Sequence, residues 1–304
     1  MFRTAALAAF LGLAIVGGAH AQGANISDAP DQPAQDSPDA RREAFRKQLD
    51  ALHWVAGPTT APIGGNSALT IPKDYVFLDA ANTAKFEELN ENVPSGREVM
   101  VAPRNLQWTA YLVFDDAGYV KDDEKIDAPG ILKSLQEGTE RENEERRRRG
   151  WPAVHVTGWN IPPAYNTATK RLEWATNLRA DDGQGVNFFT KILGRRGFTS
   201  VVLATSPERT PESVAELNQV LTGYRFNSGE SYSAWRPGDK VAEYGLAGLI
   251  VGGAAAAAVK TGLFKGLFKF IVAGAAAMWK LIVAGVAIVV GGLRSFFKRK
   301  GSNS

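Results

Sequence analysis

Apolar and polar residues alternate along the middle of the chain in patterns that predict several strands. Four segments have strand character: 97–102, 107–114, 153–159 and 170–179. Segment 107–114 is apolar on both faces, as expected of a central strand. Residues 186–193 and 198–205 flank the short polar segment Gly194-Arg195-Arg196-Gly197, which predicts a hairpin. Shorter strands joined by turns are expected between Trp54 and Phe77, where glycine and proline recur.

Apolar residues at helical spacing predict helices between these strands. The predicted helices are 41–52 (on Phe45, Leu49 and Leu52), 82–91 (capped by Asn82 or Thr83), a helix from Asp127 to Gly150, and one from Pro211 to about Leu221. Strands and helices mix without a regular βαβ rhythm. We therefore expect an α+β fold with a mainly antiparallel sheet and flanking helices.

The helix that begins at Asp127 ends in the basic run Arg146 to Arg149. Such a run is either an anion or nucleic-acid site, or a solvated helix end paired with its own acids. The second interpretation is favoured, because Glu142, Glu144 and Glu145 each precede an arginine by four residues.

The first 40 residues are expected to lie outside the folded domain. Residues 1–21 have one basic residue, an apolar run and the small-x-small site Ala19-His20-Ala21, the pattern of a cleaved signal peptide. Residues 22–40 are rich in proline and aspartate and have few large apolar groups, which predicts a disordered leader. The folded extracytoplasmic domain is then assigned to residues 41–239.

Charge changes abruptly at residue 240. Residues 22–239 hold 31 acidic and 25 basic side chains, whereas residues 240–304 hold one acid, Glu243, and nine bases. The basic charge therefore lies beside apolar runs, as in membrane-proximal segments, and not on a surface that would contact the phosphate backbone of a nucleic acid. We expect no nucleic acid partner, and we assign residues 240–304 to a membrane-anchoring tail that binds the lipid bilayer.

Residues 270–293 form an apolar stretch of 24 residues that predicts a transmembrane helix, interrupted by Lys280. One crossing puts the final basic cluster inside the cell. Two crossings, or a helix lying on the membrane surface, are the alternatives. A helical hairpin buried in the domain is disfavoured, because the tail lacks acidic partners for its lysines. Gly248-xxx-Gly252 and Gly262-xxx-Gly266 would permit self-association.

The sequence contains no defensible catalytic signature. It has no cysteine, no P-loop and no GxSxG motif, and after loss of His20 only His53 and His155 remain. No metal site and no cofactor are expected. The densest charge is the acidic turn Asp115 to Glu124, which does not have the spacing of a calcium loop and is interpreted as a solvated turn. Its carboxylates are nevertheless the best ligand-binding candidates: Asp122, Asp123 and Glu124.

Several ordered motifs resemble the bacterial "domain of unknown function 2167" family of uncharacterised membrane-anchored proteins. They begin with Trp54-xx-Gly57-Pro58 and continue with Tyr119-Val120-Lys121-Asp122-Asp123, Gly158-Trp159-xxx-Pro163-xx-Tyr165-Asn166, Leu172-xx-Trp174-Ala175, Val186-Asn187-Phe188, Leu193-Gly194-Arg195-Arg196-Gly197 and Ala242-Glu243-Tyr244-Gly245-Leu246-Ala247. The resemblance implies an envelope location and anchoring. It implies no activity, and it transfers no catalytic residue.

Two functions are therefore expected. The first is a membrane-anchored protein of the inner membrane, with its soluble domain in the periplasm and a non-enzymatic role in binding an envelope protein or maintaining the envelope. The alternative is a periplasmic enzyme, or a glycan- or ligand-binding domain, that uses the acidic turn Asp115 to Glu124.

Overall fold

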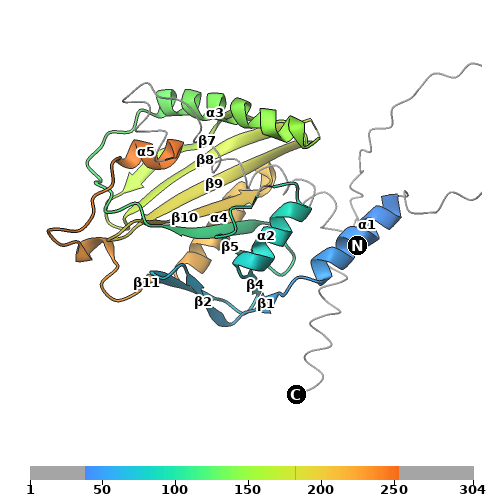
Figure 1. Cartoon of the computed structure of the whole chain (residues 1–304), viewed down its shortest axis with the longest axis horizontal. Coiled ribbons are helices and arrows are strands. Elements are labelled where there is room, and N and C mark those ends of the chain that lie inside the picture. The colour runs from blue at the N-terminus through green and yellow to red at the C-terminus, as the bar shows by residue number, and fades with distance from the viewer. Residues whose placement is uncertain (1–37, 93, 182, 253–304) are drawn as a thin grey trace, which may run out of the picture.

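The computed structural model describes residues 38–92, 94–181 and 183–252, which fold around a large twisted antiparallel sheet (Figure 1). In spatial order its eight strands are β1 (Val55–Ala56), β4 (Tyr75–Leu78), β5 (Val99–Pro103), β6 (Thr109–Asp115), β10 (Phe198–Thr205), β9 (Gly183–Leu193), β8 (Arg171–Ala180) and β7 (Val154–Asn166). A smaller antiparallel sheet has the order β11 (Tyr224–Phe226), β3 (Ser67–Ile71) and β2 (Thr59–Ile63). The α+β prediction with a mainly antiparallel sheet is confirmed.

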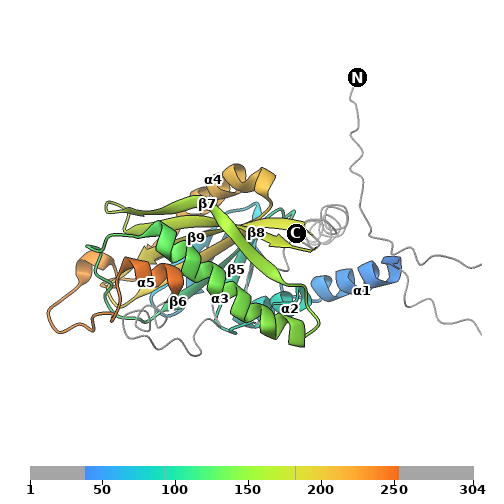
Figure 2. The ribbon, with the colours of Figure 1, turned by 90° about the horizontal axis from the view of Figure 1, so that it is seen from above.

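Five α-helices flank the large sheet in the described chain: α1 (Pro38–Asp50), α2 (Ala80–Leu89), α3 (Ala128–Arg148), α4 (Thr210–Leu221) and α5 (Leu246–Val251). Helix α4 lies across the sheet from α3 and α5 (Figure 2). Short 3₁₀ helices are η2 (Pro207–Arg209) and η3 (Tyr232–Ala234). The predicted pattern of helices between strands is thus observed, with two changes in helix position.

The first change concerns α1, which begins at Pro38 within the segment predicted as leader. Proline fits the first turn of a helix, where its missing N–H has no partner to lose. The second concerns α2. Its N-cap is Asp79, which accepts the N–H of Asn82 at 2.9 Å, and neither Asn82 nor Thr83 caps it. The helix therefore begins two residues earlier than predicted.

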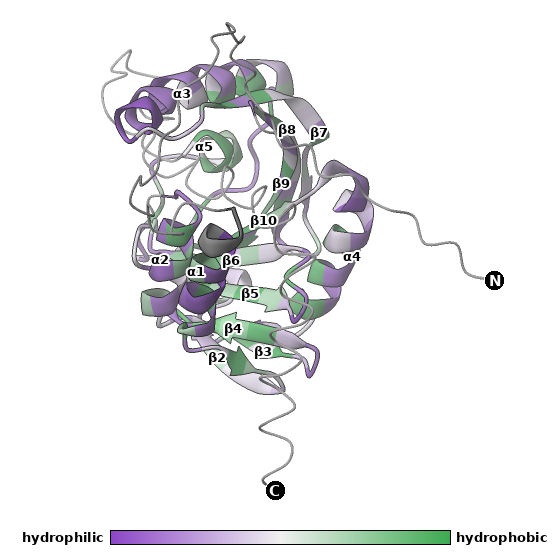
Figure 3. Cartoon of the chain, turned by 90° about the vertical axis from the view of Figure 1, so that its right-hand side faces the viewer, coloured by the Kyte–Doolittle hydropathy of each residue, from purple (hydrophilic) through white to green (hydrophobic). Residues whose placement is uncertain are grey.

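Alternating strand residues divide the core into three clusters. One face of the large sheet packs on the small sheet and α4, around Trp108, Phe188 and Leu217. On the opposite face, α2 covers one half of the sheet, around Phe86 and Met100, and the C-terminal end of α1 joins this cluster through Leu49. Helices α3 and α5 cover the other half, and Figure 3 shows α2, α3 and α5 along this face with α4 on the far side.

Helix α5 lies inside the segment that sequence reasoning gave to the tail. Leu246, Leu249, Ile250 and Val251 are 2%, 3%, 2% and 6% exposed and join the cluster under α3. The folded domain therefore includes residues 240–252, and Gly248 of the predicted self-association motif is buried in it. An apolar segment rich in alanine and glycine suits a protein core as well as a bilayer, and after Lys240 the next lysine of the tail is Lys260.

No helix within residues 38–92, 94–181 and 183–252 is long and apolar enough to cross a membrane. The predicted signal peptide 1–21, most of the predicted leader 22–40 and the predicted transmembrane helix 270–293 lie outside the described residues.

At the charged end of α3 the predicted pair Glu145–Arg149 is present, whereas Arg148 pairs with Glu145 and not with the predicted Glu144. Glu145 accepts from Arg149 at 2.8 Å and from Arg148 at 2.5 Å. Arg146 differs, because it is 7% exposed and its Nε donates to the carbonyl of Pro152 at 2.6 Å. This arginine holds the turn after the helix and is not displayed on an anion-binding surface.

Candidate functional site

The acidic segment from Asp115 to Glu124 does not gather its carboxylates around one point. Asp115 pairs with Arg97 at 3.1 Å, whereas a Glu124 oxygen accepts the N–H of Ala247 in the first turn of α5, at 3.0 Å. Asp123 is exposed. In the described part of the chain, no group of three or more histidine, aspartate or glutamate side chains is arranged for a metal. The three predicted ligand-binding residues therefore lie in one loop without forming one site.

Asp122 alone turns inward, into a polar network that sequence reasoning did not find. Its Oδ2 accepts from the Tyr165 hydroxyl at 2.7 Å and from Lys170 Nζ at 2.8 Å. Burial acts to raise the pKa of Asp122, but these two hydrogen bonds and the charge of Lys170 outweigh it and hold the pKa below the ordinary value. Burial and the Asp122 charge raise the pKa of Tyr165, which keeps its proton.

Aromatic rings extend this network toward the surface. Tyr119 stacks on Tyr232 with ring centres 4.5 Å apart, and Lys170 Nζ lies 4.8 Å from the centre of the Tyr232 ring. The Tyr232 hydroxyl donates to the carbonyl of Val120 at 2.8 Å. Trp235 continues the series 5.4 Å from Tyr119 and is 40% exposed. The network thus ends in an exposed tryptophan.

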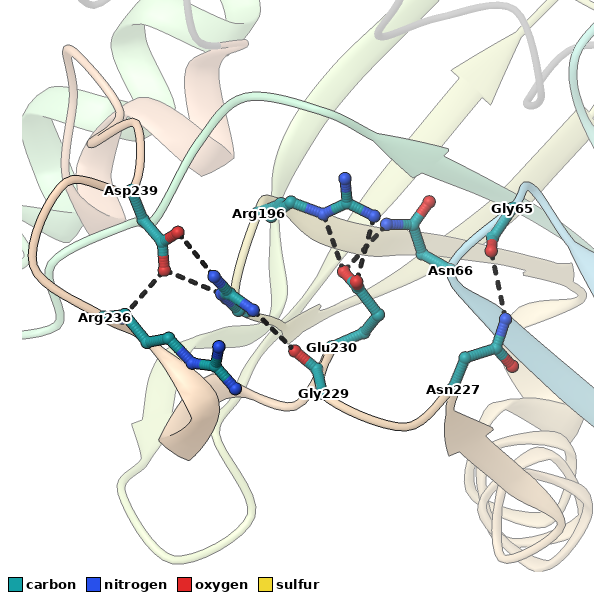
Figure 4. Close-up of polar contacts among 9 residues, drawn as sticks. Gly65, Asn66, Arg196, Asn227, Gly229, Glu230, Arg236 and Asp239 are labelled. Carbon is teal, nitrogen blue, oxygen red and sulfur yellow. Dashed lines mark hydrogen bonds and ion pairs between the residues drawn. The ribbon is translucent and has the colours of Figure 1, made fainter.

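The β9–β10 turn carries a second set of ion pairs (Figure 4). Arg195 binds both oxygens of Asp239 at 2.7 Å, and Arg196 binds both oxygens of Glu230 at 2.8 and 2.9 Å. Asn66 also donates to Glu230, at 3.0 Å, which ties the small sheet to the same loop. Bidentate arginine–carboxylate pairs fix geometry as well as charge. The predicted hairpin is confirmed, and its two arginines hold the segment that precedes α5.

Gly197 shows why this turn needs a glycine. A Cβ added there would lie 1.9 Å from the carbonyl oxygen of Asp115, so any side chain would push the β10 end away from the acidic loop. The same loop is held by the N–H of Gly118, which donates to the carbonyl of Arg196 at 2.8 Å.

Main-chain hydrogen bonds also join the acidic loop to the segment before α5. Tyr119 N–H donates to the carbonyl of Lys240 at 2.8 Å, and Ala242 N–H donates to the carbonyl of Tyr119 at 2.9 Å. Motifs far apart in the sequence therefore meet at one end of the domain, which we call the motif end: residues 119–124, 165–170, 194–197 and 227–247. This arrangement fixes the position of the chain that leads into α5.

A further unusual group is Lys191 on β9. Its Nζ lies 2.5 Å from Ser200 Oγ and 5.3 Å and 5.9 Å from the ring centres of Phe198 and Trp174. Within the described residues it has no carboxylate at ion-pair distance, and burial lowers its pKa to about 8. The sequence signal for this buried amine is a single lysine within an otherwise mostly apolar strand, and the sequence analysis did not single it out. His155, by contrast, pairs with Glu140 at 2.6 Å and remains partly exposed, as a surface histidine.

Replacing Asp122 with asparagine is expected to destabilise the domain by about 1–3 kcal/mol, because Lys170 loses a charged acceptor and Tyr165 loses a strong one. The exposed neighbour provides the matched control, and Asp123→Asn is expected to change stability little. Urea unfolding at pH 7 measures both. Since the pKa of Asp122 is lowered from 3.8 by folding, the difference between wild type and Asp122→Asn should shrink as the pH falls through this range. Equal stability of the two variants would show that the network contributes nothing.

The fold and the motif end define a class of protein: an α+β domain whose loops are locked together by ion pairs, with no recognised catalytic constellation in its described part. The chain belongs to the family described as "Protein of unknown function (DUF2167)", whose model matches residues 55–289. The resemblance inferred from the sequence motifs is thereby confirmed.

No curated protein matches the chain. Among solved structures, one similar chain is the solution structure of cyanobacterial PsbP (CyanoP) from Synechocystis sp. PCC 6803. The sequences are 8% identical, the match covers 57% of this chain and 95% of that chain, and the TM-score is 0.34. A similarity of this size carries no inference about function.

Proposed function

We propose that this chain is an exported protein of the bacterial inner membrane, with its folded domain in the periplasm and a non-enzymatic role in binding an envelope partner or maintaining the envelope. The observation that carries the proposal is the composition of the chain after Gly252. Residues 253–304 contain no acidic side chain and eight basic ones, and they include the apolar stretch 270–293. Basic residues that flank an apolar stretch favour a membrane.

The packing of α5 gives this proposal a geometric consequence. Because α5 is part of the core and the motif end fixes the chain before it, the domain has no flexible linker within the described chain. Only residues 253–269 separate Gly252 from the predicted span. If helical, this interval is about 26 Å long, so the anchor would hold the domain close to the bilayer surface.

The interaction role rests on exposed apolar side chains at the motif end. Trp235 and Val241 are both 40% exposed. The ring of Trp235 contacts the ring of Tyr119, and Val241 forms an isolated β-bridge with Tyr119. Exposed tryptophans are enriched at protein–protein contacts. The enzymatic or ligand-binding alternative has less support, because Asp122 and Glu124 are already engaged by groups of the same chain.

Membrane fractionation tests the anchoring. We expect the full-length protein to stay in the membrane pellet at high salt and in carbonate at pH 11, and to require detergent for extraction. Reporter fusions at residue 252 and at the C-terminus are expected to report opposite sides of the membrane for one crossing and the same side for two. Release by carbonate alone would refute a transmembrane anchor and favour a helix on the membrane surface.

A further inference from the structure

Lys191 and Ser200 are cross-strand neighbours on the face of the large sheet that α2, α3 and α5 cover. The register places Lys191 of β9 opposite Ser200 of β10, and Ser200 opposite Val113 of β6. Residues directly opposite one another in an antiparallel sheet project their side chains from the same face, so these three form one row. Val202, two residues along β10, projects from that face in the next row. An amine and a hydroxyl therefore lie next to each other among apolar positions.

This row crosses the boundary between the two helix covers of that face. The cluster under α3 and α5 includes Phe198 of β10, whereas the cluster under α2 includes Tyr111 of β6. Figure 3 shows α5 and α2 on this same face, over different strands. Val113 is packed into none of the three core clusters of the described residues, and Val113, Val202 and Lys191 are all partly exposed. Two apolar side chains and one amine are therefore incompletely covered at this boundary.

The amine of Lys191 has more hydrogen-bond donors than the domain has acceptors for it. A protonated lysine has three N–H donors, and Ser200 Oγ at 2.5 Å is the one acceptor for them among the described residues. The two aromatic rings beside the amine attract a cation, but they do not replace an acceptor oxygen. The described charge that acts on the amine is Asp115, which is itself paired with Arg97 at 3.1 Å. Two donors and most of one positive charge are therefore left for a ligand.

We propose that Lys191 and Ser200 bind the headgroup of a single-chain anionic amphiphile, a fatty acid carboxylate, whose apolar chain covers Val113 and Val202. A carboxylate has two acceptor oxygens, which match the free donors of Lys191 and the O–H of Ser200, since that hydroxyl accepts from the amine and can still donate. Charge complementarity selects the negative headgroup, and the two partly exposed valines select the apolar chain. All four residues lie within the described domain, so the site does not depend on the proposed membrane anchor.

Calorimetric titration of the full-length protein with octanoate tests the site, at pH 7 in a non-ionic detergent and with detergent alone as the blank. Octanoate has the carboxylate and a short apolar chain. Acetate keeps the carboxylate without the chain, and octanamide keeps the chain without the charge. We expect saturable binding of octanoate, and binding weaker by about tenfold or more for each of the other two probes, because each lacks one of the two features that the site recognises.

Three substitutions locate the bound probe. Lys191→Met is expected to weaken octanoate binding by about tenfold or more, because it removes the charged donor. Lys85→Met on the exposed face of α2 is the matched control and should leave octanoate binding unchanged. Val113→Thr, which has nearly the same shape, should weaken octanoate binding severalfold, because the apolar chain would then cover a hydroxyl. Circular dichroism checks that each variant is folded.

The pH dependence of octanoate binding to wild type keeps the test informative if Lys191→Met does not fold. Burial lowers the pKa of Lys191 to about 8, and octanoate stays ionised above pH 7. Affinity should therefore fall by about tenfold per pH unit above this pKa, since only the protonated amine attracts the carboxylate. The proposal is overturned by no saturable binding, by equal affinity of wild type and folded Lys191→Met, or by an affinity that stays constant up to pH 10. Acetate or octanamide binding as tightly as octanoate would also overturn it, and would indicate a small-anion site or a purely apolar one.

Discussion

Truncation after Lys240 is expected to abolish stable folding, whereas truncation after Gly252 should leave a folded domain. The shorter chain loses the four buried apolar side chains of α5, which lie against α3 and the sheet. Each such side chain contributes about 1.5–3 kcal/mol on burial, so the loss is of the order of 6–12 kcal/mol, as large as the whole stability of a typical domain. It also removes Ala247, whose N–H binds Glu124.

Circular dichroism and urea unfolding of the two truncations, expressed without residues 1–21, measure this effect. Substituting Ile250 with alanine in the longer chain is the graded control, and we expect a loss of about 2–5 kcal/mol with the fold retained. If both truncations unfold cooperatively at the same urea concentration, α5 adds nothing to the stability of the domain. In that case the boundary at residue 240, drawn from the charge step, would stand.

Replacing Lys191 with methionine is expected to remove a pH dependence of stability that wild type shows above pH 8. The unfolded lysine titrates near 10.5 and the folded one near 8, so between these values the unfolded state binds more protons than the folded state. Wild-type stability attributable to Lys191 must therefore rise with pH across this window, by at most about 3 kcal/mol. Below pH 8 the folded lysine carries its charge among aromatic rings, and methionine at this position avoids that cost.

The slope of stability against pH is the readout, because Lys191→Met also deprives Ser200 of its 2.5 Å partner and so shifts the absolute value. Chemical unfolding from pH 7 to pH 10.5 gives the slopes. Lys85→Met on the exposed face of α2 is the matched control and should keep the wild-type slope. A slope that is the same in wild type and Lys191→Met would mean that Lys191 titrates normally.

Local patterns predicted most of the secondary structure because they depend on nearby residues. Two-residue alternation predicted the strands, the glycines of the β9–β10 turn predicted the hairpin, and Asp127 predicted the start of α3, where it accepts the N–H of Gly130 at 3.3 Å. The N-cap of α2 was missed because Asp79, Asn82 and Thr83 all precede the same helical pattern. Only the backbone geometry distinguishes the residue that accepts the capping bond.

The candidate sites could not be assembled in this way. Asp122 was selected for local charge density, but its partners Tyr165 and Lys170 are 43 and 48 residues away. The motifs that carry the family resemblance already contained Asp122 and Tyr165, and this was the available signal that they belong together.

The sequence by itself determined the fold class, the family and the change of charge at residue 240, since each depends on residue type and short-range order. Tertiary structure alone decided which carboxylate is paired, which lysine is surrounded by aromatic rings and whether residues 246–251 belong to the folded domain. The physical reason is that burial away from water stabilises an apolar side chain equally well in a protein core and in a bilayer. Residues 246–251 would suit a bilayer as well as a core, and the apolar face of the sheet beneath α3, which they help to cover, decides in favour of the core.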